Sequence, residues 1–148
     1  MYDKQDLLAG MTVLVVDDVS FSLTLVTGML REMGSDEVLA ANGGVDALKI
    51  LQSEQGREID LVVLDMNMPG VDGLTILRMI REGQTEAAKT VAVAILSGVT
   101  EERTVRGAFS LGVDAYVTKP VSKAALGARL AKAAAHHRVS TRVQLRAS

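Results

Sequence analysis

The chain has 148 residues, of which 48% are hydrophobic, so it has the length of one domain and enough apolar surface for a sizeable core. It contains no cysteine, which excludes disulfide bridges and thiolate metal sites. The sequence shows neither a signal-peptide pattern nor an apolar run of about 18 residues, and we therefore expect a cytoplasmic protein that does not insert into a membrane. The formal net charge of −2 hides an asymmetry, because residues 115 to 148 carry basic residues and no acidic one.

Five apolar, β-branched segments alternate along the chain with segments of helical periodicity. The predicted strands cover residues 11 to 16, 37 to 41, 59 to 64, 90 to 96 and 113 to 118. The predicted helices cover residues 21 to 33, 45 to 55, 74 to 81, 101 to 111 and 122 to 135, with Ser20, Thr100 and Ser122 as candidate N-caps and Gly34 and Gly112 as stops. This alternation predicts an α/β fold, a doubly wound five-stranded parallel sheet with helices on both faces.

The central segment is residues 59 to 73, IDLVVLDMNMPGVDG, in which a continuous apolar strand ends on Asp65. Such a strand is typical of a parallel sheet that is covered on both faces. Pro69, Gly70 and Gly73 indicate a shaped loop after the acid. The alternative is that Asp65 caps the helix beginning near Leu74, but a cap stands immediately before its helix.

Polar residues follow four of the predicted strands, namely Asp17 and Asp18, then Asp65, Ser97 and Lys119. In parallel α/β sheets, ligands bind beyond the carboxyl ends of the strands, so these side chains should converge at one edge. Three clustered carboxylates repel one another unless a cation compensates them. With no His or Cys among them, they favour Mg²⁺ or Mn²⁺. Taken singly, each residue has an ordinary structural explanation, such as helix capping for Asp17 and Asp18.

The motifs DD, D-x-N-M-P-G-x-D-G, S-G and Y-x-x-K-P, in this order, resemble those of the bacterial response-regulator receiver domain, of the chemotaxis-regulator-like type. The likeness covers roughly residues 11 to 135. It implies a flavodoxin-like fold with strand order 2-1-3-4-5, and a phosphorylation-activated switch of a two-component system that is not an enzyme. We expect the receiver domain at residues 11 to 136, an N-terminal extension at 1 to 10, and a basic tail or helix extension at 137 to 148.

The resemblance implies a role for each acidic residue. Asp65 would be the phosphoacceptor, taking its phosphoryl group from the phosphohistidine of a sensor histidine kinase or a phosphotransfer protein. Asp65 and Asp18 would bind the metal directly and Asp17 through water. The backbone carbonyl of Asn67 would be a further ligand.

The resemblance also implies the switch residues. Lys119 would pair with the phosphoryl group, Ser97 would hydrogen-bond it, and Tyr116 would be the aromatic residue whose rotamer reports phosphorylation. The Lys119–Pro120 bond resembles the cis peptide of the family.

Departures from the family pattern affect the phosphoryl pocket. Ser97 stands where threonine is more frequent, and Gly98 lacks the usual small side chain, so we expect a looser switch loop. Asn67 and Val99 are best placed to control water access to the acyl phosphate. Because Val99 has no polar atom, we expect slow autodephosphorylation.

The family's output face corresponds to the helix at 101 to 111, the strand at 113 to 118 and the helix at 122 to 135. Val105, Ala108 and Phe109 are either core or partner-facing residues. We expect a downstream protein partner and no direct binding of nucleic acid.

The C-terminal segment carries a basic stripe if the last helix continues, formed by Arg138, Arg142 and Arg146. This stripe makes a second copy of the chain another candidate partner. His136 and His137 are adjacent and cannot chelate as an i, i+4 pair would.

We favour a stand-alone receiver, and two alternatives to it remain open. The first alternative is a fragment of a longer regulator with a DNA-binding or enzymatic output domain. A small phosphatase or a nucleotide-binding enzyme is less favoured, because the chain has no G-x-x-x-x-G-K-[ST] loop and Asn67 replaces the second acid of a D-x-D phosphatase motif.

Overall fold

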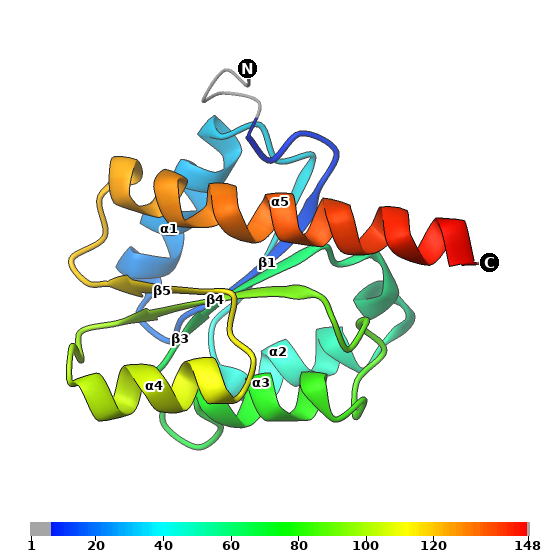
Figure 1. Ribbon diagram of the computed structural model, residues 1–148. Helices are drawn as coiled ribbons and strands as arrows, with labels where there is room; N and C mark the ends of the chain where they lie inside the picture. The colour runs from blue at the N-terminus through cyan, green and yellow to red at the C-terminus, as the bar shows by residue number, and fades with distance from the viewer. Residues whose placement is uncertain (1–6, 148) are drawn as a thin grey trace.

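The computed structural model describes residues 7 to 147, and describes residues 136 to 147 by their backbone only. Five parallel strands form one sheet in the order β2-β1-β3-β4-β5, which confirms the predicted fold class and strand order (Figure 1). The strands are β1 (Thr12–Val16), β2 (Glu37–Ala41), β3 (Leu61–Asp65), β4 (Ala92–Ser97) and β5 (Ala115–Thr118).

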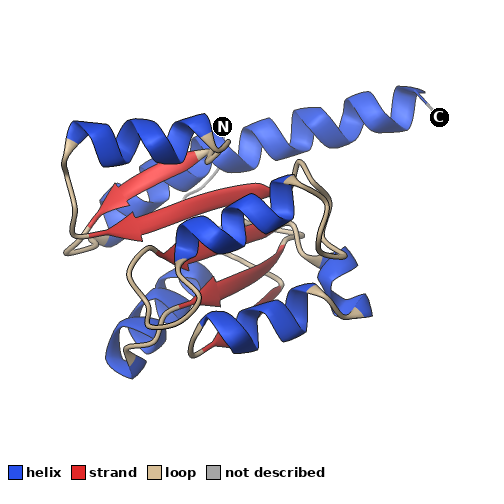
Figure 2. Ribbon diagram, turned by 90° about the horizontal axis from the view of Figure 1, so that it is seen from below, coloured by secondary structure: helices blue, strands red, loops and turns tan. Residues whose placement is uncertain are grey.

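Helices cover both faces of the sheet. Figure 1 shows α1 and α5 on one face and α2, α3 and α4 on the other, and Figure 2 shows the same layers from below. The helices are α1 (Ser20–Glu32), α2 (Gly44–Leu51), the 3₁₀ helix η2 (Glu54–Glu58), α3 (Gly73–Arg81), α4 (Glu102–Ser110) and α5 (Lys123–Ala147).

Strand β3 lies at the centre of the sheet and contributes to both hydrophobic cores. Leu61 and Val63 pack with α1 and α5, while Val62 and Leu64 pack with α2, α3 and α4. All four side chains are fully buried. Because successive strand residues point to opposite faces, burial on both faces explains why this segment is continuously apolar.

The segment before β1 is anchored in the core between the sheet and helices α1 and α5. Leu8 is fully buried in the core beneath α1, and its backbone N–H donates to Met33 O at 2.9 Å. Residues 1 to 6 of the predicted N-terminal extension lie outside the described residues.

Two of the three predicted helix caps are wrong. Ser20 is the first residue of α1, not its cap, and Val19 occupies the N-cap position. Thr100 does not cap α4, whose N-cap is Glu101. The cap at Ser122 is confirmed, because its Oγ accepts the N–H of Ala125 at 3.1 Å. In each failed case a serine or threonine matched the usual residue preference for a cap, but the N-cap position lies one residue away from it.

Several predicted boundaries are displaced. Strands β3, β4 and β5 each begin two residues later than predicted, although the preceding Asp60 and Asp114 already donate their N–H groups to Thr12 O and Val93 O at 2.8 Å. Helix α2 ends at Leu51 and not at residue 55. A Cβ on Gly56 would lie 2.3 Å from Leu51 O, so the chain turns back on α2 at a place where only glycine fits.

Helix α5 continues to Ala147, and Figures 1 and 2 show that its C-terminal part extends beyond the edge of the sheet. The side chains of the predicted basic stripe, and of His136 and His137, lie outside the described residues. In the described part of the chain, no helix combines the length and the apolar character needed to cross a membrane.

Candidate functional site

Three carboxylates gather at the carboxyl edge of the sheet. Asp17 and Asp18 follow β1, and Asp65 is the last residue of β3. One oxygen of each lies within 4.8 Å of the others. Asp17 and Asp65 are buried, with 1% and 5% of their surface exposed, whereas Asp18 is exposed. The parallel register of β1 and β3 places these ends side by side, as their positions after the strands predict.

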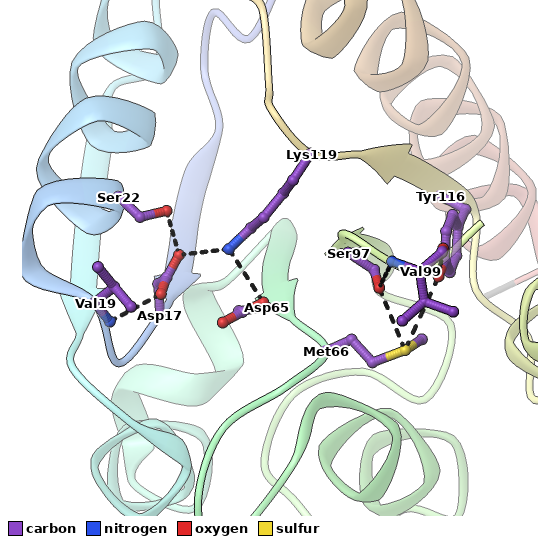
Figure 3. Close-up of polar contacts among 9 residues, drawn as sticks. All are labelled: Asp17, Val19, Ser22, Asp65, Met66, Ser97, Val99, Tyr116 and Lys119. Atoms are coloured by element: carbon purple, nitrogen blue, oxygen red, sulfur yellow. Dashed lines mark hydrogen bonds and ion pairs between the residues drawn. The ribbon is translucent and has the colours of Figure 1, made fainter. Parts of the chain in front are cut away.

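Lys119 joins this cluster from the end of β5. Its Nζ lies 3.3 Å from Asp65 Oδ1 and 3.4 Å from Asp17 Oδ2 (Figure 3). Its backbone N–H donates to Ser97 O at 2.8 Å, which fixes the start of the loop that follows. The Lys119–Pro120 peptide bond is cis, as the family resemblance implies.

Asp17 is held by the first turn of α1. Its Oδ1 accepts the Val19 N–H at 2.9 Å, and its Oδ2 accepts the Ser22 hydroxyl at 2.5 Å (Figure 3). Asp18 makes no hydrogen bond or ion pair with the described residues and points its exposed carboxylate to the same cluster. The helix-capping explanation is wrong for both acids, because Val19 occupies the N-cap position and Asp17 accepts the N–H of Val19 itself. The oxygens of Asp17 are already occupied, so Asp18 is the more available ligand.

Burial raises the pKa of Asp65 above its usual value of 3.8, and the neighbouring Asp17 carboxylate raises it further. Lys119 and the backbone of Asn67 act in the opposite direction, but they do not compensate fully. A hard divalent cation would relieve this repulsion, and the donors present are all oxygens. The residues therefore fit a Mg²⁺ ion.

The loop after Asp65 is shaped by close contacts. Gly70 has a φ of +82°, and a Cβ on Gly73 would lie 2.6 Å from Asp65 O. Gly73 is thus required for a close approach and not for an unusual φ. Asp72, and not Asp65, caps α3 by accepting the Thr75 N–H at 2.8 Å, so the capping alternative for Asp65 is wrong. Asn67 is exposed in this loop.

The predicted switch residues Ser97 and Tyr116 are linked through shared contacts with Met66 and Val99. The Tyr116 ring is buried, and its hydroxyl donates to Val99 O at 2.6 Å. Ser97 is fully buried, and its Oγ accepts the Val99 N–H at 3.0 Å. The Ser97 hydroxyl makes no hydrogen bond to Asp65 within the described residues; it lies 3.6 Å from Met66 Sδ (Figure 3).

The structure shows which of the output-face residues Val105, Ala108 and Phe109 are buried and which are exposed. Ala108 is fully buried in the core, and Val105 packs partly against it. Phe109 exposes 49% of its surface on α4.

Sequence reasoning missed two residues of this region. Ser22 stands five positions after Asp17, on the first turn of a helix, and a polar residue there was a usable signal. Met66 lies directly after Asp65, where an apolar residue carries no sign of polar contact.

Comparisons with known proteins agree on one family. Residues 13 to 131 match the response regulator receiver domain. The chain is 33% identical over 123 residues to the chemotaxis protein CheY-3 of Vibrio cholerae, an alignment that covers 83% of this chain and 91% of the relative.

Solved structures give the same result. A response regulator receiver domain protein from Clostridium thermocellum superposes with a TM-score of 0.77 at 31% identity, covering 87% of this chain and 98% of that one. CheY in the CheX–CheY–BeF3–Mg²⁺ complex from Borrelia burgdorferi is similar, with a TM-score of 0.72 at 28% identity and coverage of 82% and 87%. The chain therefore belongs to the response regulator receiver domain family, the phosphorylation-activated signalling switches of two-component systems.

Proposed function

We propose that Asp65 is the phosphoacceptor of this switch. The observation that carries the proposal is the position of its carboxylate, which is buried at a strand end, clustered with Asp17 and Asp18, and 3.3 Å from Lys119 Nζ. A carboxylate attacks as it stands and needs no general base. One Asp65 oxygen forms a bond to phosphorus while the bond from phosphorus to the donor's imidazole nitrogen breaks, which gives an acyl phosphate.

The neighbouring residues stabilise this transfer by position and charge. Phosphoryl transfer requires neutralisation of the equatorial oxygens, and the Lys119 ammonium already lies beside the Asp65 carboxylate. Asp18, Asp65 and the Asn67 backbone carbonyl would hold Mg²⁺, with Asp17 acting through water because its oxygens already accept Val19 and Ser22. When bound, the ion would supply positive charge to both the acids and the phosphoryl oxygens.

The phosphoryl donor in this proposal is a sensor histidine kinase or a phosphotransfer protein. A recess of about 250 Å³ at the N-terminus of α2 is lined by Asp18 and Pro69 and borders the cluster at Asp18. Phosphorylation adds negative charge at Asp65, and Ser97 and Lys119 are the residues that gain a partner. We assign the output to the face formed by α4, β5 and α5, where Tyr116 links β5 to the loop before α4 through Val99.

Val99 also sets the lifetime of the phosphorylated state in this proposal. Its branched side chain is half-buried, and both its backbone N–H and its carbonyl are held by Ser97 and Tyr116. With Asn67 as the only polar group of this pair, water is poorly positioned for hydrolysis.

Intact-mass measurement tests the phosphoacceptor. Incubated with Mg²⁺ and acetyl phosphate, the wild-type chain should gain the mass of one phosphoryl group, and Asp65→Asn should gain none. Asp72→Asn is the matched control, because it alters another acid of the same loop while an asparagine can still cap α3. Equal phosphorylation of Asp65→Asn and wild type would show that another residue accepts the group.

A further inference from the structure

Met66 places a sulfur atom between the two hydroxyls of the switch. Its Sδ lies 3.6 Å from Ser97 Oγ and 4.0 Å from Tyr116 Oη (Figure 3). The side chain is buried, with 5% of its surface exposed. The Met66 backbone N–H donates to Leu96 O at 3.0 Å, so the sheet itself fixes the residue that follows Asp65.

The Ser97 hydroxyl has one proton, and its surroundings direct that proton to Met66. The Ser97 Oγ accepts the Val99 N–H, which uses one of its lone pairs. The acceptor that the described residues offer to its proton is Met66 Sδ. Because Ser97 is fully buried, a proton without an acceptor would carry a desolvation cost.

We propose that Met66 is a positioning residue that holds the Ser97 hydroxyl in the unphosphorylated state and so sets how readily it turns to the phosphoryl group. This inference rests on the proposed phosphorylation of Asp65. A thioether is a weak acceptor, so it satisfies the buried proton but gives it up when a charged phosphoryl oxygen becomes available.

The same contacts give Met66 a route to the output face. Ser97 holds the Val99 N–H, and Tyr116 holds the Val99 carbonyl, so Met66, Ser97, Val99 and Tyr116 form a closed ring of contacts. When Ser97 turns from Met66 to the phosphoryl group, the Val99 backbone loses or shifts one of its two partners. The sulfur therefore belongs to the element that passes the signal from Asp65 to Tyr116.

Replacement of Met66 by leucine tests the sulfur, because leucine keeps the volume and removes the acceptor. The probe is beryllofluoride with Mg²⁺, and the apparent affinity comes from the rise in melting temperature across a titration. In Met66→Leu the buried hydroxyl lacks an acceptor until the phosphoryl mimic arrives, so beryllofluoride should bind about threefold to tenfold more tightly than in wild type. The affinity for Mg²⁺ alone should not change.

Met68→Leu is the matched control, because Met68 is also buried in this loop and accepts no hydrogen bond within the described residues. In a Ser97→Ala background, Met66→Leu should have no effect on beryllofluoride affinity, since the hydroxyl that it releases is absent. If Met66→Leu fails to fold, Met66→Ile removes the same acceptor.

The inference is overturned if Met66→Leu binds beryllofluoride as wild type does, if Met68→Leu shifts the affinity equally, or if the shift persists in Ser97→Ala. These results leave the proposed function intact. A wild-type chain that binds no beryllofluoride with Mg²⁺ would instead overturn the proposed function, and this inference with it.

Discussion

At the amino edge of the sheet, three aspartates each exchange hydrogen bonds with the backbone of a neighbouring strand or of the segment that leads into it. Asp60 donates its N–H to Thr12 O and accepts the Thr12 N–H at 2.9 Å, and Asp114 does the same with Val93. Asp36 accepts the Gly10 N–H at 2.9 Å. At the carboxyl edge, Asp18 and Asp65 face each other and Asp17 across less than 4.8 Å.

The two groups of carboxylates differ in the hydrogen-bond donors and charges that surround them. The amino-edge acids take backbone N–H groups that the sheet would otherwise leave unpaired, and they stabilise the fold. At the carboxyl edge, Asp65 has a neighbouring acid and a single Lys119 ammonium, and its pKa is raised. The same residue type is therefore structural at one edge and poised to bind a cation and a phosphoryl group at the other.

Arg81 should give the largest effect, and it acts at the amino edge. Its guanidinium donates to the carbonyls of Gly112, Lys89 and Val91 and pairs with Asp114 at 3.1 Å. Both side chains are at most 20% exposed. We expect Arg81→Met to lower the free energy of unfolding by about 3 kcal/mol, because it removes the donor to three backbone carbonyls and the positive charge that pairs with the largely buried Asp114.

Urea denaturation measures this loss, and phosphorylation by acetyl phosphate should persist in the folded variant. Arg78→Met on the same helix is the control, because Arg78 is exposed. If the two variants lose the same stability, the Arg81 network does not hold this edge together.

The second prediction compares one substitution at the two ends of β3. Asp60→Ala should destabilise the protein by about 1 kcal/mol, because the Thr12 N–H loses its acceptor. Asp65→Ala should stabilise the metal-free protein by about 1 kcal/mol, because it removes a buried acid from beside Asp17. Chemical denaturation in the presence of a chelator gives both values. Effects of the same sign would mean that the two edges do not differ in the way their contacts indicate.

The sequence was sufficient for the architecture because the periodicity of the apolar residues and the order of the polar strand ends are local signals. It placed Asp17, Asp18, Asp65 and Lys119 at one edge, since parallel strands bring their carboxyl ends together. The direction in which a side chain points depends on residues that are distant in the sequence. The turn of Ser97 toward Met66 depends on packing between β3 and β4, and the cap at Ser20 failed because Asp17 holds the loop one residue earlier.

The sequence also could not predict that Asp60 and Asp114 accept backbone N–H groups of neighbouring strands while Asp65 lies beside another acid. Asp60 precedes its strand and Asp65 ends it, which the sequence shows. The N–H groups that Asp60 and Asp114 accept belong to residues 48 and 21 positions away, and their alignment depends on the register of the sheet. Only the folded chain reveals which acids are already satisfied.

The last and smallest effect is the pH dependence of stability at the carboxyl edge. The folded chain raises the pKa of Asp65, chiefly by burial and then by the charge of Asp17. Well below the ordinary value of 3.8, Asp65 is protonated in both the folded and the unfolded chain and favours neither. As the pH rises through the raised pKa, the unfolded chain has already released this proton while the folded chain still holds it, so stability falls. The metal-free wild type should therefore lose stability relative to Asp65→Asn as the pH rises from the ordinary value of 3.8 to the raised pKa, by a fraction of the effect expected for Asp65→Ala. Thermal melting of both proteins across this range, with a chelator and again with millimolar Mg²⁺, measures the difference.

The ion competes with the proton for the same oxygens, so Mg²⁺ should reduce the slope of stability against pH. Suppose that, without metal, the stability of wild type relative to Asp65→Asn does not change with pH, or increases as the pH rises. The repulsion would then act on a residue other than Asp65.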